Sequence, residues 1–345
     1  ISELPEEFWN GYNGGGEPYG LINIALSRKI GRIKDGEKYP DPNVEGYNPC
    51  AEQSLANYET CCLSEIYLCN INNYEELKDI ATIVYRICKH SLLLGCHQEE
   101  TEKIVHKNLR MGIGITGYLQ SSQEQKSWLN DLYEYLREYD NYYSDLIGVP
   151  RSVKLTTVKP SGTLSLLGGA TPGVHPAYSK YYLRTVRMSS SDKLVQICRD
   201  LGYHTEFLLN FDGTENRDTI VVYFPCETPD GAILADDMDV IKQLEMVKKL
   251  QSVWSDNAVS VTAYYTPEEL ESLKSWLKDN YKNHLKSVSF LLRKKHGFKQ
   301  APYQEITEEE YLRASEKIKN KIFNTISSGE LIQGIECEGG VCPIR

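Results

Sequence analysis

Strand-like and helical segments alternate along most of this chain of 345 residues. Between Tyr74 and about Cys96, apolar residues recur at intervals of three and four, which indicates an amphipathic helix. Runs rich in β-branched and aromatic residues predict strands. Strands are expected at 20–26, 62–68, 151–158, 181–188, 219–224 and 258–265, and further helices at 122–147, 192–201, 237–255, 267–283 and 307–328. Alternation of this kind predicts an α/β fold with parallel strand pairing.

Composition and charge place the chain among ordinary globular proteins. Hydrophobic residues make up 41% and charged residues 25% of it, and no apolar run approaches the roughly 18 residues that a membrane-spanning helix needs. The N-terminus lacks the basic and apolar segments of a secretory signal, so we expect a cytoplasmic protein without membrane contact. A formal net charge of -10 argues against binding to nucleic acid.

One loop combines a thiol with a carboxylate. Cys50 lies two residues before Glu52, which can exchange a proton with a bound hydroxyl group, and Asn48 can hydrogen-bond the same substrate. Cys61 follows with a second thiol. The spacing lacks the short cysteine pairs of a zinc site and no histidine is local, so we predict neither a metal nor a histidine-activated nucleophile here.

A further pair of thiols, Cys337 and Cys342, lies within the last nine residues. The glycines between them make the segment pliable, so the pair can close on itself and exchange with a buried disulfide. The alternative is a disordered tail with two incidental cysteines. The cysteines without partner spacing are expected to be small buried apolar residues: Cys69, Cys88, Cys96, Cys198 and Cys226.

Two glycine-containing runs invite comparison with phosphate sites. Pro160-Ser161-Gly162-Thr163 forms a turn before an expected short helix, where free amides and hydroxyls suit an anion. The alternative is an ordinary helix capped by Ser161 or Thr163. The run 112–117 matches G-x-G-x-x-G, but a helical pattern precedes it, so it indicates close backbone packing rather than a dinucleotide site.

Together these runs resemble the C-terminal half of class II, adenosylcobalamin-dependent ribonucleotide reductases, and most closely the ribonucleoside-triphosphate type. The similar segments are Asn-Gly-Tyr-Asn-Gly-Gly-Gly-Glu-Pro at 10–18, Asn-Pro-Cys-Ala-Glu at 48–52, the turn at 160–163, Gly-Val-His-Pro at 173–176, Asp-Asn-Ala-Val-Ser at 256–260 and Glu-Cys-Glu-Gly-Gly-Val-Cys-Pro at 336–343.

The resemblance implies a ten-stranded α/β barrel, of which this chain supplies the second half and a central finger loop. Residues 1–47 would end the first barrel half and connect it to the second. Residues 48–330 would form the finger loop and the second half, and residues 331–345 a flexible C-terminal redox tail. The chain also begins in a glycine-rich loop with no element before it, so we expect it to be part of a larger protein.

The resemblance also implies roles for the residues of the finger loop. Cys50 would carry the thiyl radical that abstracts the ribose 3′ hydrogen. Glu52 would take the proton of the 3′-hydroxyl, and Asn48 would hold the substrate hydroxyls. Cys61 would reduce the 2′ carbon together with a thiol of the first barrel half.

Two other sets of residues acquire roles in the same way. Cys337 and Cys342 would return the active-site disulfide to thiols and then receive electrons. The residues that would hold the substrate phosphates are Pro160, Ser161, Gly162 and Thr163.

The implied activity is the reduction of ribonucleotides, expected to be triphosphates, to 2′-deoxyribonucleotides. Adenosylcobalamin would be the cofactor, a thioredoxin-like protein the reductant, and a separate N-terminal half of the reductase the partner. One alternative is a non-catalytic, nucleotide-binding thiol module. Another is a fragment of a class I large subunit, but such subunits carry a tyrosine pair shortly before the tail, whereas Tyr264 and Tyr265 lie far upstream and are expected to be strand residues.

Overall fold

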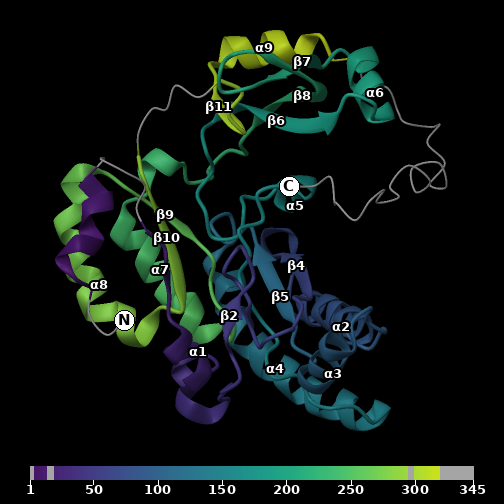
Figure 1. Cartoon of the computed structure of the whole chain (residues 1–345), viewed down its shortest axis with the longest axis vertical. Helices are drawn as coiled ribbons and strands as arrows, with labels where there is room; N and C mark the ends of the chain where they lie inside the picture. Colours follow the sequence, from purple (N-terminus) through teal and green to yellow (C-terminus); the bar gives the residue numbers. More distant parts are fainter. Residues whose placement is uncertain (1–3, 14–18, 294–298, 319–345) are drawn as a thin grey trace. The chain divides into compact units, whose positions relative to one another are not determined.

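The computed structural model of the chain describes residues 4–13, 19–293 and 299–318 (Figure 1). The chain divides into two compact units. The first comprises Ile1–Lys180 and Thr228–His296, and the second comprises Tyr181–Glu227 and Gly297–Arg345.

The first unit contains most of the helices and the short strands. In chain order its strands and α-helices are β1 (Leu21–Ile22), α1 (Ile24–Lys29), β2 (Gly46–Tyr47), β3 (Ser54–Leu55), β4 (Leu63–Tyr67), α2 (Tyr74–Ser91), α3 (Glu99–Asn108), β5 (Gly112–Thr116), α4 (Gln123–Ile147), α5 (Leu164–Leu167), α7 (Val240–Val253), β9 (Thr262–Tyr265), α8 (Leu270–His284) and β10 (Ser287–Leu292). Turns of 3₁₀ helix lie at Glu6–Asn13, Ile33–Lys38, Leu68–Asn70, Ala235–Asp237 and Pro267–Glu269.

A set of parallel extended segments runs through this unit and is called the parallel set below. Its members are β4, β5, residues 154–158, β9 and β10. Strand β4 pairs with β5, and β9 pairs with β10. Residues 154–158 connect the two pairs, because Thr156 forms a parallel bridge with Ile113 of β5 and Val158 forms one with Val259, just before β9. Strand β1 pairs antiparallel with β10 at the end of the set. The predicted α/β fold with parallel pairing is therefore confirmed for the first unit.

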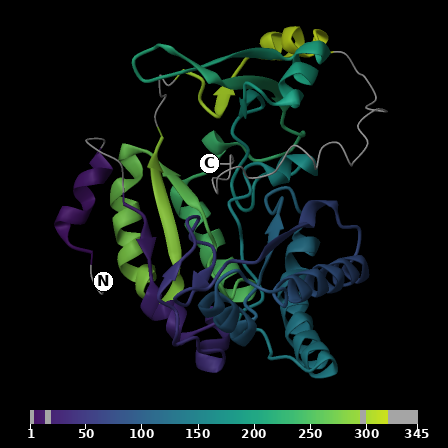
Figure 2. The ribbon, with the colours of Figure 1, turned by 45° about the vertical axis from the view of Figure 1, so that its right-hand side comes forward.

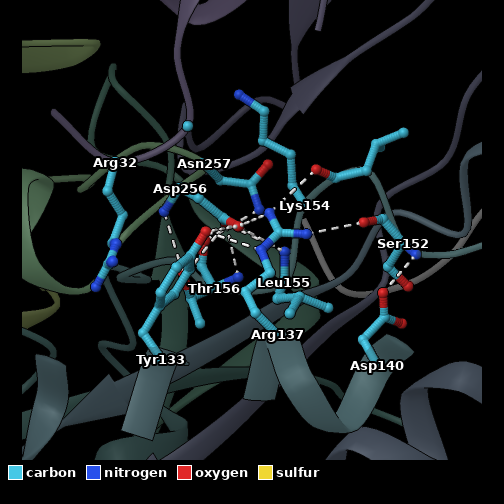
Figure 3. Close-up of polar contacts among 12 residues, drawn as sticks. Arg32, Tyr133, Arg137, Asp140, Ser152, Lys154, Leu155, Thr156, Asp256 and Asn257 are labelled. Carbon is cyan, nitrogen blue, oxygen red and sulfur yellow. Dashed lines mark hydrogen bonds and ion pairs between the residues drawn. The ribbon is translucent and has the colours of Figure 1, made fainter. Parts of the chain in front are cut away.

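The predicted strand at 151–158 is wrong as a continuous strand, and the reason is a distant carboxylate. The backbone N–H groups of Leu155 and Thr156 donate to Asp256 at 3.1 and 2.8 Å instead of to a neighbouring strand. Arg137 of α4 donates to the same carboxylate at 2.5 Å (Figure 3). Asp256 thus replaces part of the ladder and joins this segment to the core.

Helices α2, α3 and α4 gather against one side of the β4–β5 pair (Figures 1 and 2). Helix α4 begins with a capping box between Ser122 and Gln125, and Gly148 ends it in the left-handed conformation. The predicted helix at 122–147 is confirmed. The helix predicted to start at Tyr74 is also present, but it ends at Ser91, earlier than expected.

The two faces of β5 differ in character. Ile113 and Ile115 lie in the apolar core with Ile66 of β4. Gly112 and Gly114 alternate with them, and a Cβ at Gly112 would come within 2.7 Å of a side-chain carbon of the neighbouring strand. The prediction that the glycine run reflects close packing is therefore confirmed, because these glycines lie within a buried strand rather than in a loop after one.

Helices α7 and α8 complete the core around β9 and β10. The side chain of Gln243 in α7 donates to the carbonyl of Thr262 at 3.2 Å and accepts from the N–H of Tyr264 at 3.3 Å. Tyr264 and Tyr265 belong to β9, so the prediction that they are strand residues is confirmed.

The second unit is a small α/β layer. Its elements are β6 (Tyr181–Ser189), α6 (Lys193–Leu201), β7 (His204–Leu209), β8 (Glu215–Glu227), β11 (Tyr303–Glu305) and α9 (Glu308–Glu316). The strands lie in the order β11-β6-β8-β7, and all of their pairings are antiparallel. The prediction of parallel pairing is wrong here, because the short turn between β7 and β8, with Gly213 at a φ of +83°, returns the chain directly.

No helix among the described residues is long and apolar enough to cross a membrane. Helix α9 occupies the first part of the predicted helix at 307–328. The helix ends at Glu316, and residues 319–328 of that prediction, like the expected redox tail with Cys337 and Cys342, lie outside the described residues.

Candidate active site

The loop that carries Cys50 is the tip of a hairpin formed by β2 and β3. Tyr47 pairs with Ser54 at its base. The side-chain oxygen of Asn48 accepts the N–H of Gln53 at 3.0 Å, and the N–H of Asn48 donates to the carbonyl of Gln53 at 3.1 Å. Asn48 therefore closes the loop through its side-chain oxygen and its backbone N–H.

Hydroxyl groups from the parallel set hold the tip of the loop in place. Ser260 donates to the carbonyl of Cys50 at 2.6 Å, and Ser287 donates to the carbonyl of Ala51 at 2.7 Å. Thr157 donates to the carbonyl of Glu52 at 2.8 Å. These bonds fix the backbone of the tip against the ends of strand segments that are far apart in the sequence.

The thiols of Cys50 and Cys61 belong to one electrostatic cluster. Both residues are exposed and unbonded, although the protein partly shields their sulfur atoms. This shielding raises the pKa of Cys50, and the Glu52 carboxylate and the Cys61 thiol add to the effect. Burial and Glu52 likewise raise the pKa of Cys61. Lys159 acts in the opposite direction on both thiols.

Glu52 is a buried acid of the cluster. Its residue is only 2% exposed, and its Oε2 accepts no hydrogen bond from any residue that the structure describes. Burial raises the pKa of Glu52, and Glu65 adds to this effect, whereas Asn48 and Lys159 oppose it. A buried carboxyl group with a raised pKa and a free oxygen is suited to proton exchange with a bound hydroxyl.

The turn at 160–163 leads into α5, which spans four residues. Thr163 precedes that helix, and within the described residues its side chain makes no capping hydrogen bond. The hydroxyl of Ser161 donates to the Glu65 carboxylate, and its backbone has a φ of +38°. Neither hydroxyl caps the helix, so the structure does not support the alternative of a helix cap.

Sequence reasoning missed two charged residues of this site, Glu65 and Lys159. The side chain of Glu65 is fully buried in β4, and its Oε2 lies 3.7 Å from Nζ of Lys159, whose side chain is 18% exposed. Both residues lie in extended segments, in which successive side chains point to opposite faces. That alternation could have placed them on a common face, but only with the register of β4 against β5 known.

The predicted site residues belong to three sets: the Cys50 loop together with Cys61, the turn at 160–163, and the two tail thiols. Asn48, Cys50, Glu52 and Cys61 come together at the loop, and Glu65 links them to the turn that holds Ser161. The tail thiols lie outside the described residues. No group of three or more metal-ligating side chains occurs in the described ranges.

The other cysteines are varied. Cys88 and Cys198 are buried, as predicted, whereas Cys69, Cys96 and Cys226 are partly exposed. A hydrogen bond with the Cys62 thiol lowers the pKa of the buried Cys88 thiol.

Comparison with known proteins points to one enzyme family. A sequence model of the family "Ribonucleotide reductase, barrel domain" matches residues 148–291. The adenosylcobalamin-dependent ribonucleoside-triphosphate reductase of Euglena gracilis is 35% identical over 326 residues, which are 92% of this chain and 43% of that protein. The enzyme of the same description from Lactobacillus acidophilus is 31% identical over 373 residues, or 96% of this chain and 49% of that protein.

A solved structure agrees with the sequence matches. The crystal structure of a B-12 dependent (class II) ribonucleotide reductase superposes with a TM-score of 0.77 at 29% identity, covering 92% of this chain and 48% of that one. The chain thus spans about half the length of the curated relatives that it matches.

Proposed function

Since the chain is a homologue of class II, adenosylcobalamin-dependent ribonucleoside-triphosphate reductases over about half their length, we propose that it carries the thiol site of such an enzyme. It would act with a separate N-terminal segment that supplies the rest of the barrel. The observation that carries the proposal is the anchored loop, in which an exposed thiol, Cys50, lies in one cluster with Glu52 and Cys61.

The proposed reaction replaces the 2′-hydroxyl of a ribonucleotide with hydrogen. Cys50, as a thiyl radical, takes the hydrogen atom from C3′ and later returns one. Glu52 accepts the proton of the 3′-hydroxyl, which its raised pKa and unbonded oxygen support. The 2′-hydroxyl leaves as water. Two thiols, Cys61 and one from the separate segment, supply two electrons and two protons and become a disulfide.

Positioning of the substrate falls to the loop and the neighbouring turn. Asn48 offers its side-chain N–H groups to the ribose hydroxyls, because its oxygen is already committed to Gln53. We assign the triphosphate to the turn formed by Pro160, Ser161, Gly162 and Thr163. The absence of a hydroxyl cap on the described helix α5 supports this assignment.

The described residues fit a radical-generating cofactor in one respect. Cys50 is an exposed residue while its backbone is held by Ser260, so a group can approach this residue without moving the loop. Adenosylcobalamin, when bound, would supply the radical that removes the hydrogen atom of this thiol. Rigid anchoring keeps the sulfur at a constant position for both the cofactor and the substrate.

The C-terminal tail would reduce the active-site disulfide back to two thiols after each turnover. Cys337 and Cys342 can exchange with the disulfide of Cys61 and then be reduced by a thioredoxin-like protein.

The test is deoxynucleotide formation from a radiolabelled ribonucleoside triphosphate with adenosylcobalamin and a dithiol. We expect product when this chain is mixed with a matching N-terminal half, and none from either chain alone. Cys50→Ser should reduce the product to background, whereas Cys96→Ser, which alters a thiol outside the site, should leave it unchanged. An inactive mixture that still binds nucleotide would favour a binding module instead.

A further inference from the structure

We propose that Glu65 and Lys159 form a positioning pair, which holds a positive charge beside the thiols of Cys50 and Cys61 and joins them to the Ser161 turn. The inference deepens the proposed function and rests on it for any effect on turnover. The charge pair itself can be tested without turnover.

The glycines of β5 fix the course of the Lys159 side chain. A Cβ at Gly114 would lie 3.3 Å from Cδ and 3.4 Å from Cγ of Lys159, so the lysine stem crosses the strand where a side chain is missing. A Cβ at Gly112 would likewise lie 3.0 Å from Cγ2 of Thr157. Thr157 and Lys159 therefore share one face of the parallel set.

That face is the one covered by the thiol loop. Thr157 donates from it to the carbonyl of Glu52, and residues 158 and 260 are joined by a backbone hydrogen bond of 3.0 Å. Ser260 in turn donates to the carbonyl of Cys50. The aliphatic part of the Lys159 side chain therefore lies on the face of β5 that the Cys50 loop covers, and not on the face that packs against the helices.

Glu65 fixes the end of the lysine. It lies directly opposite Gly114 in the β4–β5 pairing, with a fully buried side chain. Its Oε2 accepts a hydrogen bond from the hydroxyl of Ser161 and lies 3.7 Å from Nζ of Lys159. The other oxygen has no hydrogen-bond partner among the described residues. A buried carboxylate requires a counter-charge, and Lys159 is the cation that contacts it.

The ammonium group of Lys159 acts on both thiols and on Glu52. Burial and Glu52 raise the pKa values of the Cys50 and Cys61 thiols, and Lys159 is the cation that opposes them. Lys159 also acts to lower the pKa of Glu52, whereas burial and the nearby Glu65 raise it. It acts to lower the pKa of Cys88 in α2 as well. Without Lys159 the two carboxylates and the thiols would face one another uncompensated.

Alkylation of the full chain by iodoacetamide tests this arrangement, because only the thiolate reacts. The rate constants of Cys50 and Cys61 are measured over a range of pH by peptide mass spectrometry and divided by that of Cys96. In Lys159→Met we expect both ratios to fall about threefold to tenfold near neutral pH, with reaction midpoints at higher pH. Lys159→Arg, which keeps the charge, should retain most of the ratio.

The ratio to Cys96 separates a charge effect from loosening of the fold. A second neutral variant, Lys159→Gln, should reproduce the Met result. Unchanged ratios in both neutral variants would overturn the proposal, as would an equal fall in Lys159→Arg. Since alkylation needs neither nucleotide nor cofactor, this result is independent of whether the mixture of chains forms deoxynucleotides.

Discussion

The residue that best distinguishes a reactive loop from an ordinary hairpin is Glu52. Its carboxyl group is buried and carries an oxygen that accepts no hydrogen bond from the described residues, while its backbone carbonyl accepts hydrogen bonds from Thr157 and from the N–H of Ala258. Such a group lowers stability when charged, so its presence is easier to understand as a requirement of chemistry than of folding. Neighbouring Gln53 is equally buried, but it is neutral.

We expect Glu52→Gln to affect activity and stability in opposite directions. Loss of the proton acceptor should slow deoxynucleotide formation about a hundredfold or more. Because burial raises the pKa of Glu52 in the folded chain above the ordinary 4.5, wild-type stability declines as pH rises through the folded pKa. The variant should therefore be more stable than wild type at neutral pH, and this advantage should vanish in acid below the ordinary pKa. Urea unfolding at several pH values measures it, and an advantage that grows in acid would contradict the assignment.

At the scale of elements, Asp256 connects parts of the chain that lie far apart in the sequence. Its carboxylate accepts bonds from the backbone of the 154–158 segment and from Tyr133 and Arg137 of α4 (Figure 3). Burial alone would raise the pKa of Asp256, but Arg137, the backbone N–H groups and Lys154 outweigh it and lower the pKa. The Asp256 carboxylate therefore fixes the backbone of the 154–158 segment, which contains Thr157 and leads to Lys159 at the site.

Asp256→Asn should destabilise the chain by about 3–5 kcal/mol, because it leaves the buried Arg137 guanidinium without its counter-charge. Since the pKa of Asp256 is lowered, its contribution is present above the ordinary aspartate pKa and is lost as pH falls through the folded value. The difference between wild type and variant in urea unfolding should therefore shrink in acid.

The matched control is Asp145→Asn, which removes an exposed ion pair with Arg151 and should cost at most about 1 kcal/mol. Equal losses in the two variants would mean that Asp256 contributes no more than a surface charge.

The helices of this fold were predictable from patterns between residues close in the sequence. The features that were not predictable depend on contacts between residues far apart in the sequence. The capping box at Ser122 and the apolar spacing of α2 depend on neighbours in the chain, so both helices were predictable. The interruption of 151–158 depends on Asp256, a hundred residues away in sequence. The thiol loop was recognisable from its residue types, whereas Lys159 and Glu65 become visible only once β4 and β5 are in register.

At the scale of the whole molecule, the chain spans about half the length of its relatives, and β4 lies at one end of the described parallel set, paired only with β5. An unpaired strand edge of this kind is a template for further pairing. If a separate segment completes the proposed barrel, it has to reach this edge or the opposite end of the set at β1 and β10.

Hydrogen exchange can locate that contact. In a mixture with the proposed N-terminal half, we expect the backbone N–H groups of Leu63–Tyr67 that do not face β5 to exchange at least about tenfold more slowly than in the chain alone. Those of Gln123–Ile147 in α4, which already lie within helical hydrogen bonds, should be unchanged. Protection at β1 and β10 without protection at β4 would mean that the partner joins only the other end of the set. Deoxynucleotide formation without protection at either end would show that the two chains assemble through a different surface and that the barrel is not completed by strand pairing.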